Sequence, residues 1–261
     1  MMAPSILTAE EIKKYNPRPL SNVVKLSSNE NPYGPSERVR NAIIDSFEDA
    51  CRYPYEYILE LQKSLAKKHN VSPESIVITG GSNEALRVTG LAIADGGGDI
   101  VAGQPTYLAL MSYAESWGGK IKWVPVDSNK GYDLGKIEES IDKQTKMVFI
   151  ANPNNPTGSY LQPDAISSFI SQVPPHVVIV LDEAYNEYLS PEQRYDAIAW
   201  VRTHSNLIVS RSFSKAYGLA GLRIGYGIAQ PTLTDLLNRI RQPFNVNSLA
   251  QAAAIAALQD E

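Results

Sequence analysis

The sequence predicts a doubly wound α/β domain with a mostly parallel sheet, and two patterns along the chain support this fold class. Short apolar runs without polar alternation have the character of strands buried on both faces, at residues 76–79, 99–102, 146–151, 177–181 and 207–210. Helical stretches lie before, between and after them, at residues 57–69, 82–94, 108–117, 163–172 and 232–241. Such alternation is typical of a sheet covered by helices on both sides.

Residues with chemically useful side chains come after the end of each predicted strand. In chain order the strands lead to residues 80–83, Tyr107, Asn155, Asp182 and Lys215, all of which carry groups suited to binding or catalysis. Ligands of open α/β sheets bind outside the carboxyl ends of the strands. We therefore expect these groups to meet at one edge of the sheet and to form a single site.

The composition is that of an ordinary globular protein, and it argues against several classes of function. Of 261 residues, 43% are apolar and 20% are charged. The net charge of −4 disfavours nucleic-acid binding, and no apolar run approaches the length of a membrane span. The histidines are too scattered to suggest a metal site. The lone Cys51 fits a reducing compartment and the first residues lack a signal-peptide pattern, so we expect a cytoplasmic protein.

The turn at residues 79–84 joins the first predicted strand to a helix through two glycines. A helix N-terminus presents unpaired N–H groups and a partial positive charge, which makes it an anion site. The same turn is equally typical of a plain helix start capped by Ser or Asn, so alone it leaves both interpretations open. Its spacing differs from the dinucleotide fingerprint and from the P-loop, which disfavours a nucleotide ligand.

Residues 212–225, Ser-Phe-Ser-Lys-Ala-Tyr-Gly-Leu-Ala-Gly-Leu-Arg-Ile-Gly, place one lysine between hydroxyl groups and a glycine-rich arginine segment. Such neighbours suit a crowded anion pocket, where a lysine can act as an amine nucleophile toward a carbonyl. The segment resembles the lysine signature of fold-type-I pyridoxal-phosphate (PLP) aminotransferases. The resemblance implies that Lys215 forms a Schiff base with PLP. It also implies that the cofactor phosphate is bound by Ser82, Asn83, Ser212, Ser214 and Arg223.

The resemblance extends to residues that would surround the cofactor ring. A buried Asp182 needs a positive partner, and the ring nitrogen would be one; the alternative is that Asp182 caps the next helix. Residues 155–158, Asn-Pro-Thr-Gly, read alone as a structural loop, but they match the family motif whose asparagine hydrogen-bonds the ring oxygen. That role falls to Asn155, with Tyr185 beside it, and Tyr107 matches the stacking position. The implied catalytic residues are Lys215, Asp182 and Tyr185.

Residues 25–35, 52–54 and 243–251 resemble the histidinol-phosphate aminotransferases within this family. In that subgroup the tyrosine of Arg-Tyr-Pro reaches the neighbouring subunit's cofactor phosphate, so Tyr53 implies a homodimer. The resemblance further implies that Asn29, Asn155 and Tyr53 contact substrate. Glutamate and 2-oxoglutarate would be one amino-group pair, with imidazole-acetol phosphate accepting the amino group to give histidinol phosphate.

The resemblance also implies a division of the chain. Residues 1–35 would form an N-terminal arm that belongs to a small domain, residues 36–245 a large PLP-binding domain, and residues 246–261 the start of a linker helix. In the family this helix leads to the rest of the small domain, which carries an arginine for the substrate α-carboxylate. We expect the small domain to be incomplete in this chain.

Two other functions remain open from the sequence. The first is another reaction on the same fold, by an aromatic or other amino-acid aminotransferase or a threonine-phosphate decarboxylase, because the cofactor motifs do not fix the substrate. The second is a non-catalytic PLP-binding module, which would retain the large domain without transaminating. The missing arginine favours this module, whereas Lys215, Asp182 and Arg223 argue against it.

Overall fold

The computed structural model of the protein describes residues 25–94 and 97–260. Contacts within the chain divide it into two units, residues 1–30 and residues 31–261. In the first unit, Lys25 Nζ pairs with Glu30 Oε2 at 2.8 Å. The helices and strands of the described residues all belong to the second unit. No helix among them combines the length and apolar character needed to cross a membrane.

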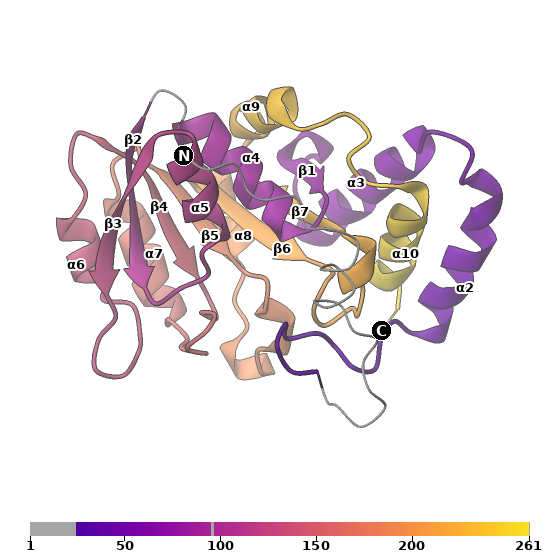
Figure 1. The fold of residues 1–261 in the computed structure, drawn as a ribbon, viewed down its shortest axis with the longest axis horizontal. Helices are drawn as coiled ribbons and strands as arrows, with labels where there is room; N and C mark the ends of the chain where they lie inside the picture. The colour runs from indigo at the N-terminus through magenta and orange to yellow at the C-terminus, as the bar shows by residue number, and fades with distance from the viewer. Residues whose placement is uncertain (1–24, 95–96, 261) are drawn as a thin grey trace, which may run out of the picture. The chain divides into compact units, whose positions relative to one another are not determined.

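A single mixed sheet of seven strands lies at the centre of the second unit, counted over its described residues (Figure 1). Its spatial order is β1-β7-β6-β5-β4-β2-β3. Only β7 is antiparallel to its neighbours, β1 and β6, and the other pairs are parallel. The strands are β1 Ile76–Thr79, β2 Gly98–Gln104, β3 Gly119–Pro125, β4 Thr145–Ala151, β5 Val178–Asp182, β6 Leu207–Ser212 and β7 Gly225–Ile228.

Helices alternate with these strands along the chain. They are α2 Glu37–Asp45, α3 Tyr55–His69, α4 Ser82–Ala94, α5 Ala109–Ser116, α6 Leu134–Glu139, α7 Pro163–Gln172, α8 Ala197–Thr203, α9 Pro231–Ile240 and α10 Ser248–Leu258. Short 3₁₀ segments are η1 Ser46–Asp49, η2 Pro73–Ser75, η3 Asn186–Tyr188, η4 Pro191–Gln193 and η5 Ala220–Leu222. Proline stands at the start of α7 and α9, where its missing N–H is tolerated.

Two apolar layers cover the sheet, one on each face. Side chains alternate between faces along a strand, so Val178 and Val180 of β5 join one layer while Ile179 and Leu181 join the other. Helices α4, α5 and α9 cover the first face, and α3, α6, α7, α8 and α10 contribute to the layer on the second. The predicted doubly wound, mostly parallel architecture is confirmed.

Helices α2 and α10, from opposite ends of the second unit, pack side by side. Helix α10 is rich in alanine and buried on nearly all of its surface, so it belongs to the core of this unit. Asn247 caps it by accepting a hydrogen bond from Ala250 N at 2.8 Å. The proposed divisions at residues 35 and 245 remain predictions.

The five predicted strands all exist, with ends that differ by a few residues, but the prediction missed β3 and β7 as well as α2, α6 and α8. Strand β7 reads Gly-Tyr-Gly-Ile, and glycine has a low strand propensity, so no local pattern marked it. Strand β3 lies at the sheet edge and carries Lys120, Lys122 and Pro125, which obscured its apolar pattern.

The antiparallel direction of β7 places its first residue at the edge where its neighbours end. The carboxyl ends of β1 and β6 lie beside the amino end of β7, since Gly225 pairs with both Thr79 and Ser212. Arg223, two residues before Gly225, therefore lies at the edge where the parallel strands end. This edge holds the candidate site.

Candidate active site

Asp182 is the last residue of β5, and its side chain is almost completely buried, with 4% of the residue exposed. Burial removes hydration from the carboxylate and raises the pKa of Asp182 to about 7; nearby Glu183 also raises it, whereas Lys215 lowers it. Among the described residues, Asp182 Oδ1 has no hydrogen-bond partner. The carboxylate is therefore poised to receive a cationic hydrogen-bond donor.

Two other predicted catalytic residues lie near this carboxylate. Lys215, half-buried after β6, has its Nζ 5.5 Å from the centre of the Tyr185 ring. The same lysine is close enough to Asp182 to lower its pKa electrostatically. The structure thus brings together an amine, a phenol and a buried carboxylate, as predicted from the strand ends.

This arrangement fits the ring of PLP better than it fits a helix cap. The next helical segment, η3, begins at Asn186, and its capping position is Tyr185, without a side-chain capping bond. The alternative that Asp182 caps a helix is therefore wrong. A protonated ring nitrogen would supply both the charge and the hydrogen that the orphaned Asp182 oxygen lacks.

The residues predicted to bind the phosphate lie where three segments converge. The Arg223 guanidinium donates from Nη2 to Gly80 O at 3.3 Å, and from Nη1 to Ser214 Oγ at 3.4 Å and Ala220 O at 2.9 Å. Ser212 Oγ accepts from Ser214 N at 3.0 Å. Arginine, hydroxyl groups and a helix N-terminus are the groups that suit an anion cup, and phosphate binding here remains a prediction.

Two glycines permit this close approach. Gly81 has a φ of +82°, and a Cβ at that position would lie 2.5 Å from Arg223 Nη2. A Cβ on Gly225 would lie 2.7 Å from Ser82 N, so a larger residue would push the loop away from β7. Sequence reasoning identified the glycine-rich turn but not the strand against which it packs.

Ser82 is the first residue of α4, and Asn83 follows it in the first turn. Asn83 Oδ1 accepts a hydrogen bond of 2.6 Å from the Tyr107 hydroxyl. Burial raises the pKa of Tyr107, which keeps the hydroxyl protonated as a donor. Tyr107 is thereby fixed beside the first turn of α4, while ring stacking by Tyr107 and phosphate binding by Asn83 remain predictions.

Asn155 lies in the turn after β4, but its neighbour Asn154 makes the contacts that hold this region. Asn154 Oδ1 accepts from the Tyr132 hydroxyl at 2.7 Å and from Thr106 Oγ1 at 3.0 Å. Asn154 Nδ2 donates to Pro105 O at 3.1 Å. Because Thr106 precedes Tyr107, this network joins the predicted stacking residue to the turn that carries Asn155.

Sequence reasoning missed this network and a buried ion pair. Tyr132 gave no local signal, although the paired asparagines at 154 and 155 were visible within a motif. Arg211 donates from Nε and Nη2 to Glu183 Oε2, at 2.9 and 2.7 Å. A glutamate and an arginine at the ends of adjacent apolar strands were the available signal for this pair.

The remaining predicted residues lie in different settings. Tyr53 is 69% exposed and its ring packs on Phe244, with ring centres 4.5 Å apart. Its contact with a partner subunit remains a prediction. Asn29 belongs to the first unit, where its backbone has a φ of +51°, so its substrate contact also remains a prediction. Within the described residues, no group of His, Cys, Asp and Glu side chains could hold a metal ion.

Comparison with known proteins gives matches over nearly the whole sequence. Histidinol-phosphate aminotransferases from Ralstonia nicotianae and Cupriavidus pinatubonensis are 50% and 48% identical over 240 residues. Each alignment covers 92% of this chain but 64% of the relative, so this chain spans slightly less than two thirds of their length. The crystal structure of histidinol-phosphate aminotransferase from Sinorhizobium meliloti in complex with PLP has a TM-score of 0.87 at 28% identity, covering 98% of this chain and 69% of that one.

The structural match agrees with the predicted fold, which is that of fold-type-I PLP aminotransferases. A family model described as aminotransferase class I and II matches residues 21–261. Since this match includes every strand of the sheet and every predicted catalytic residue, the chain belongs to the aminotransferase class I and II family.

Proposed function

We propose that this chain carries the PLP-binding part of an aminotransferase that acts on histidinol phosphate. The observation that carries the proposal is the orphaned oxygen of buried Asp182, at the sheet edge that also presents Lys215. An isolated buried carboxylate is costly, and a bound cation offsets that cost. The names of the relatives at 50% and 48% identity support histidinol phosphate as the substrate.

PLP, when bound, supplies an electron sink for the bond that breaks at the substrate carbon. Asp182 would hold the proton on the ring nitrogen and so preserve that sink. Lys215 would attach the cofactor through its amine and, once released, move a proton to and from the substrate carbon. Tyr185 and Asn155 would hydrogen-bond the ring oxygen, and Tyr107 would cover a face of the ring.

At the other end of the cofactor, Arg223, Ser212, Ser214 and the first turn of α4 would hold the phosphate. A guanidinium beside backbone N–H groups provides charge and direction together. The exposed Tyr53 supports a homodimer in which this ring reaches the partner's phosphate site. Glutamate and 2-oxoglutarate would be the second substrate pair, and the single Cys51 is compatible with a cytoplasmic location.

The test is covalent capture of the cofactor. The protein is incubated with PLP, reduced with borohydride and digested, and the modified peptide is identified by mass spectrometry. We expect the label on Lys215 and its loss in Lys215→Ala, while the exposed-lysine control Lys143→Ala keeps it. Label spread over surface lysines would contradict the assignment.

Substrate class is tested separately, by the change in the cofactor spectrum on adding an amino donor. Histidinol phosphate should convert the bound cofactor more efficiently than tyrosine or threonine phosphate does. A stronger response to either competitor would favour one of the other reactions on this fold. Cofactor capture without a response to any amine would favour a non-catalytic binding module.

A further inference from the structure

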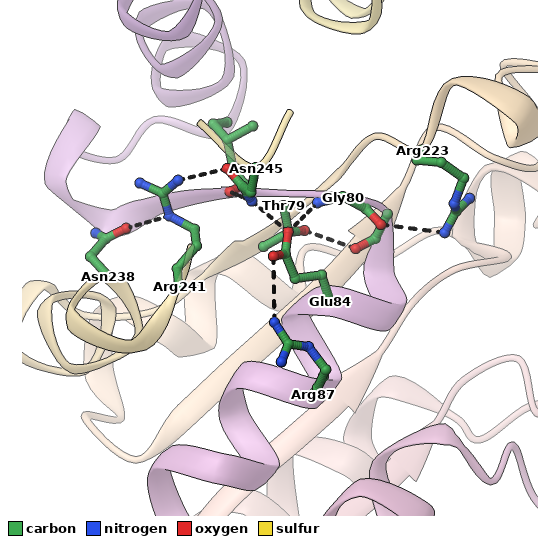
Figure 2. A network of polar contacts seen from close by, with 10 residues as sticks. Thr79, Gly80, Glu84, Arg87, Arg223, Asn238, Arg241 and Asn245 are labelled. Atoms are coloured by element: carbon green, nitrogen blue, oxygen red, sulfur yellow. Dashed lines mark hydrogen bonds and ion pairs between the residues drawn. The ribbon is translucent and has the colours of Figure 1, made fainter. Parts of the chain in front are cut away.

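Glu84 occupies an unusual place for an acidic residue, because it lies in the first turn of α4 beside the proposed phosphate cup. Its side chain is 14% exposed. Figure 2 shows that its carboxylate points back to the turn after β1, where Oε2 accepts hydrogen bonds from Gly80 N and from Asn245 Nδ2. The proposed cofactor chemistry gives this residue no role.

The Gly80 backbone is held from both sides. Its N–H donates to Glu84, and its carbonyl accepts from Arg223 Nη2 at 3.3 Å (Figure 2). Arg223 in turn donates to Ser214 Oγ at 3.4 Å. A shift of the Gly80 backbone would therefore displace the carbonyl that holds the Arg223 guanidinium. Glu84 can thus influence the position of Arg223 without contacting the anion.

A second set of contacts holds Glu84 itself. Asn245 Nδ2 also donates to Ile78 O at 3.2 Å, and Asn245 Oδ1 accepts from Arg241 Nη1 at 2.6 Å. A continuous polar chain thus runs from Arg241 through Asn245 and Glu84 to Gly80 (Figure 2). It joins the segment between α9 and α10 to the turn after β1.

The charge of Glu84 makes a purely electrostatic role unfavourable. A carboxylate near a phosphate site repels the anion, since like charges oppose each other. Two arginines offset that charge: Arg87 Nη2 lies 3.8 Å from Glu84 Oε1, and Arg241 interacts with Glu84 electrostatically. Because these arginines offset the charge of Glu84, we attribute its role to the hydrogen bonds that it accepts and not to its charge.

We propose that Glu84 is a positioning residue for the phosphate end of the cofactor site, acting through the Gly80 peptide on Arg223. This inference rests on the proposed function, because it presumes a phosphate-bearing ligand in the cup. Its consequence is selective: Glu84 supports affinity for the phosphate of PLP and leaves recognition of the ring to Asp182 and Tyr107.

The test compares PLP with pyridoxal, which lacks the phosphate, by spectroscopic titration of Glu84→Leu and Glu84→Gln. Leucine cannot accept the Gly80 hydrogen bond, so PLP affinity should fall about tenfold, while pyridoxal affinity stays within about twofold. Glutamine keeps an acceptor oxygen and should retain PLP affinity close to that of the unmodified protein. Exposed Glu37, in the first turn of α2, provides matched control variants that should leave both affinities unchanged.

Two other binding results would overturn the proposal, and they can be told apart. Tighter PLP binding in both Glu84 variants would mean that the residue acts only by charge. An equal loss for PLP and pyridoxal would mean a general structural role. If Glu84→Leu does not fold, Asn245→Ala removes one of the two hydrogen bonds that the Glu84 carboxylate accepts and should weaken PLP binding selectively. An unchanged ratio of PLP affinity to pyridoxal affinity refutes the inference. If the unmodified protein does not prefer PLP over pyridoxal, the proposed function itself fails.

Discussion

Replacing Asp182 with asparagine should change how the stability of the cofactor-free protein depends on pH. Burial raises the pKa of Asp182 from its ordinary value of 3.8 to about 7. Between these two values the folded protein holds a proton that the unfolded chain has released. The free energy of unfolding therefore falls as pH rises through this window, and the loss is complete above the folded pKa. Asparagine does not titrate, so the variant lacks this loss.

The size of the effect follows from the two pKa values. One pKa unit corresponds to about 1.4 kcal/mol, so the full effect of the shift is about 4 kcal/mol. Part of it already occurs below pH 5, because the unfolded carboxyl ionises there. Between pH 5 and pH 8 the free energy of unfolding of the variant should rise by about 2.5 kcal/mol relative to that of the unmodified protein.

The measurement is urea unfolding of both cofactor-free proteins at pH 5 and pH 8, with exposed Asp164→Asn as the control. The quantity of interest is the difference between variant and unmodified protein at each pH. If that difference is the same at both pH values, the carboxylate is ionised in the folded protein without a cationic ligand, and the reasoning fails. Added PLP should stabilise the unmodified protein more than the variant, since only a carboxylate holds the ring proton.

Two further sets of changes test the packing of the site. Gly81→Ala places a Cβ against the Arg223 guanidinium on a backbone with positive φ, so unfolding free energy should fall by about 1–3 kcal/mol and PLP binding should weaken. Gly158 also has a positive φ, but no atom lies within 4 Å of an added Cβ. Gly158→Ala should therefore lower the unfolding free energy by less and leave PLP affinity unchanged. Tyr132→Phe leaves Asn154 without one of its buried donors and should cost about 1–3 kcal/mol in denaturant unfolding; an unchanged midpoint would show that the hydroxyl is dispensable.

Local sequence was sufficient to predict much of the fold and to identify the candidate reacting groups. A strand buried on both faces must be apolar throughout, so β4, β5 and β6 could be recognised from their residues alone. Because parallel strands share one carboxyl edge, Asp182 and Lys215 could be placed together from the order of the predicted strands and helices. Their separation of 33 positions in the sequence did not matter to that inference.

Contacts between distant segments depended on the tertiary structure. The path of β7 between β1 and β6 has no local signal. Gly225 is required by the backbone at Gly81 and Ser82, whereas Gly227 is required by the close approach of Val77 in β1. Tyr132 becomes a functional neighbour only when its hydroxyl meets Asn154 and Thr106. The sequence by itself thus determined five of the seven strands and the candidate reacting side chains, since a continuous apolar run is a local pattern and the shared carboxyl edge of parallel strands is a general rule. The tertiary structure alone decided which residues hold those side chains in place, because a hydrogen bond between distant segments leaves no periodic pattern in either one.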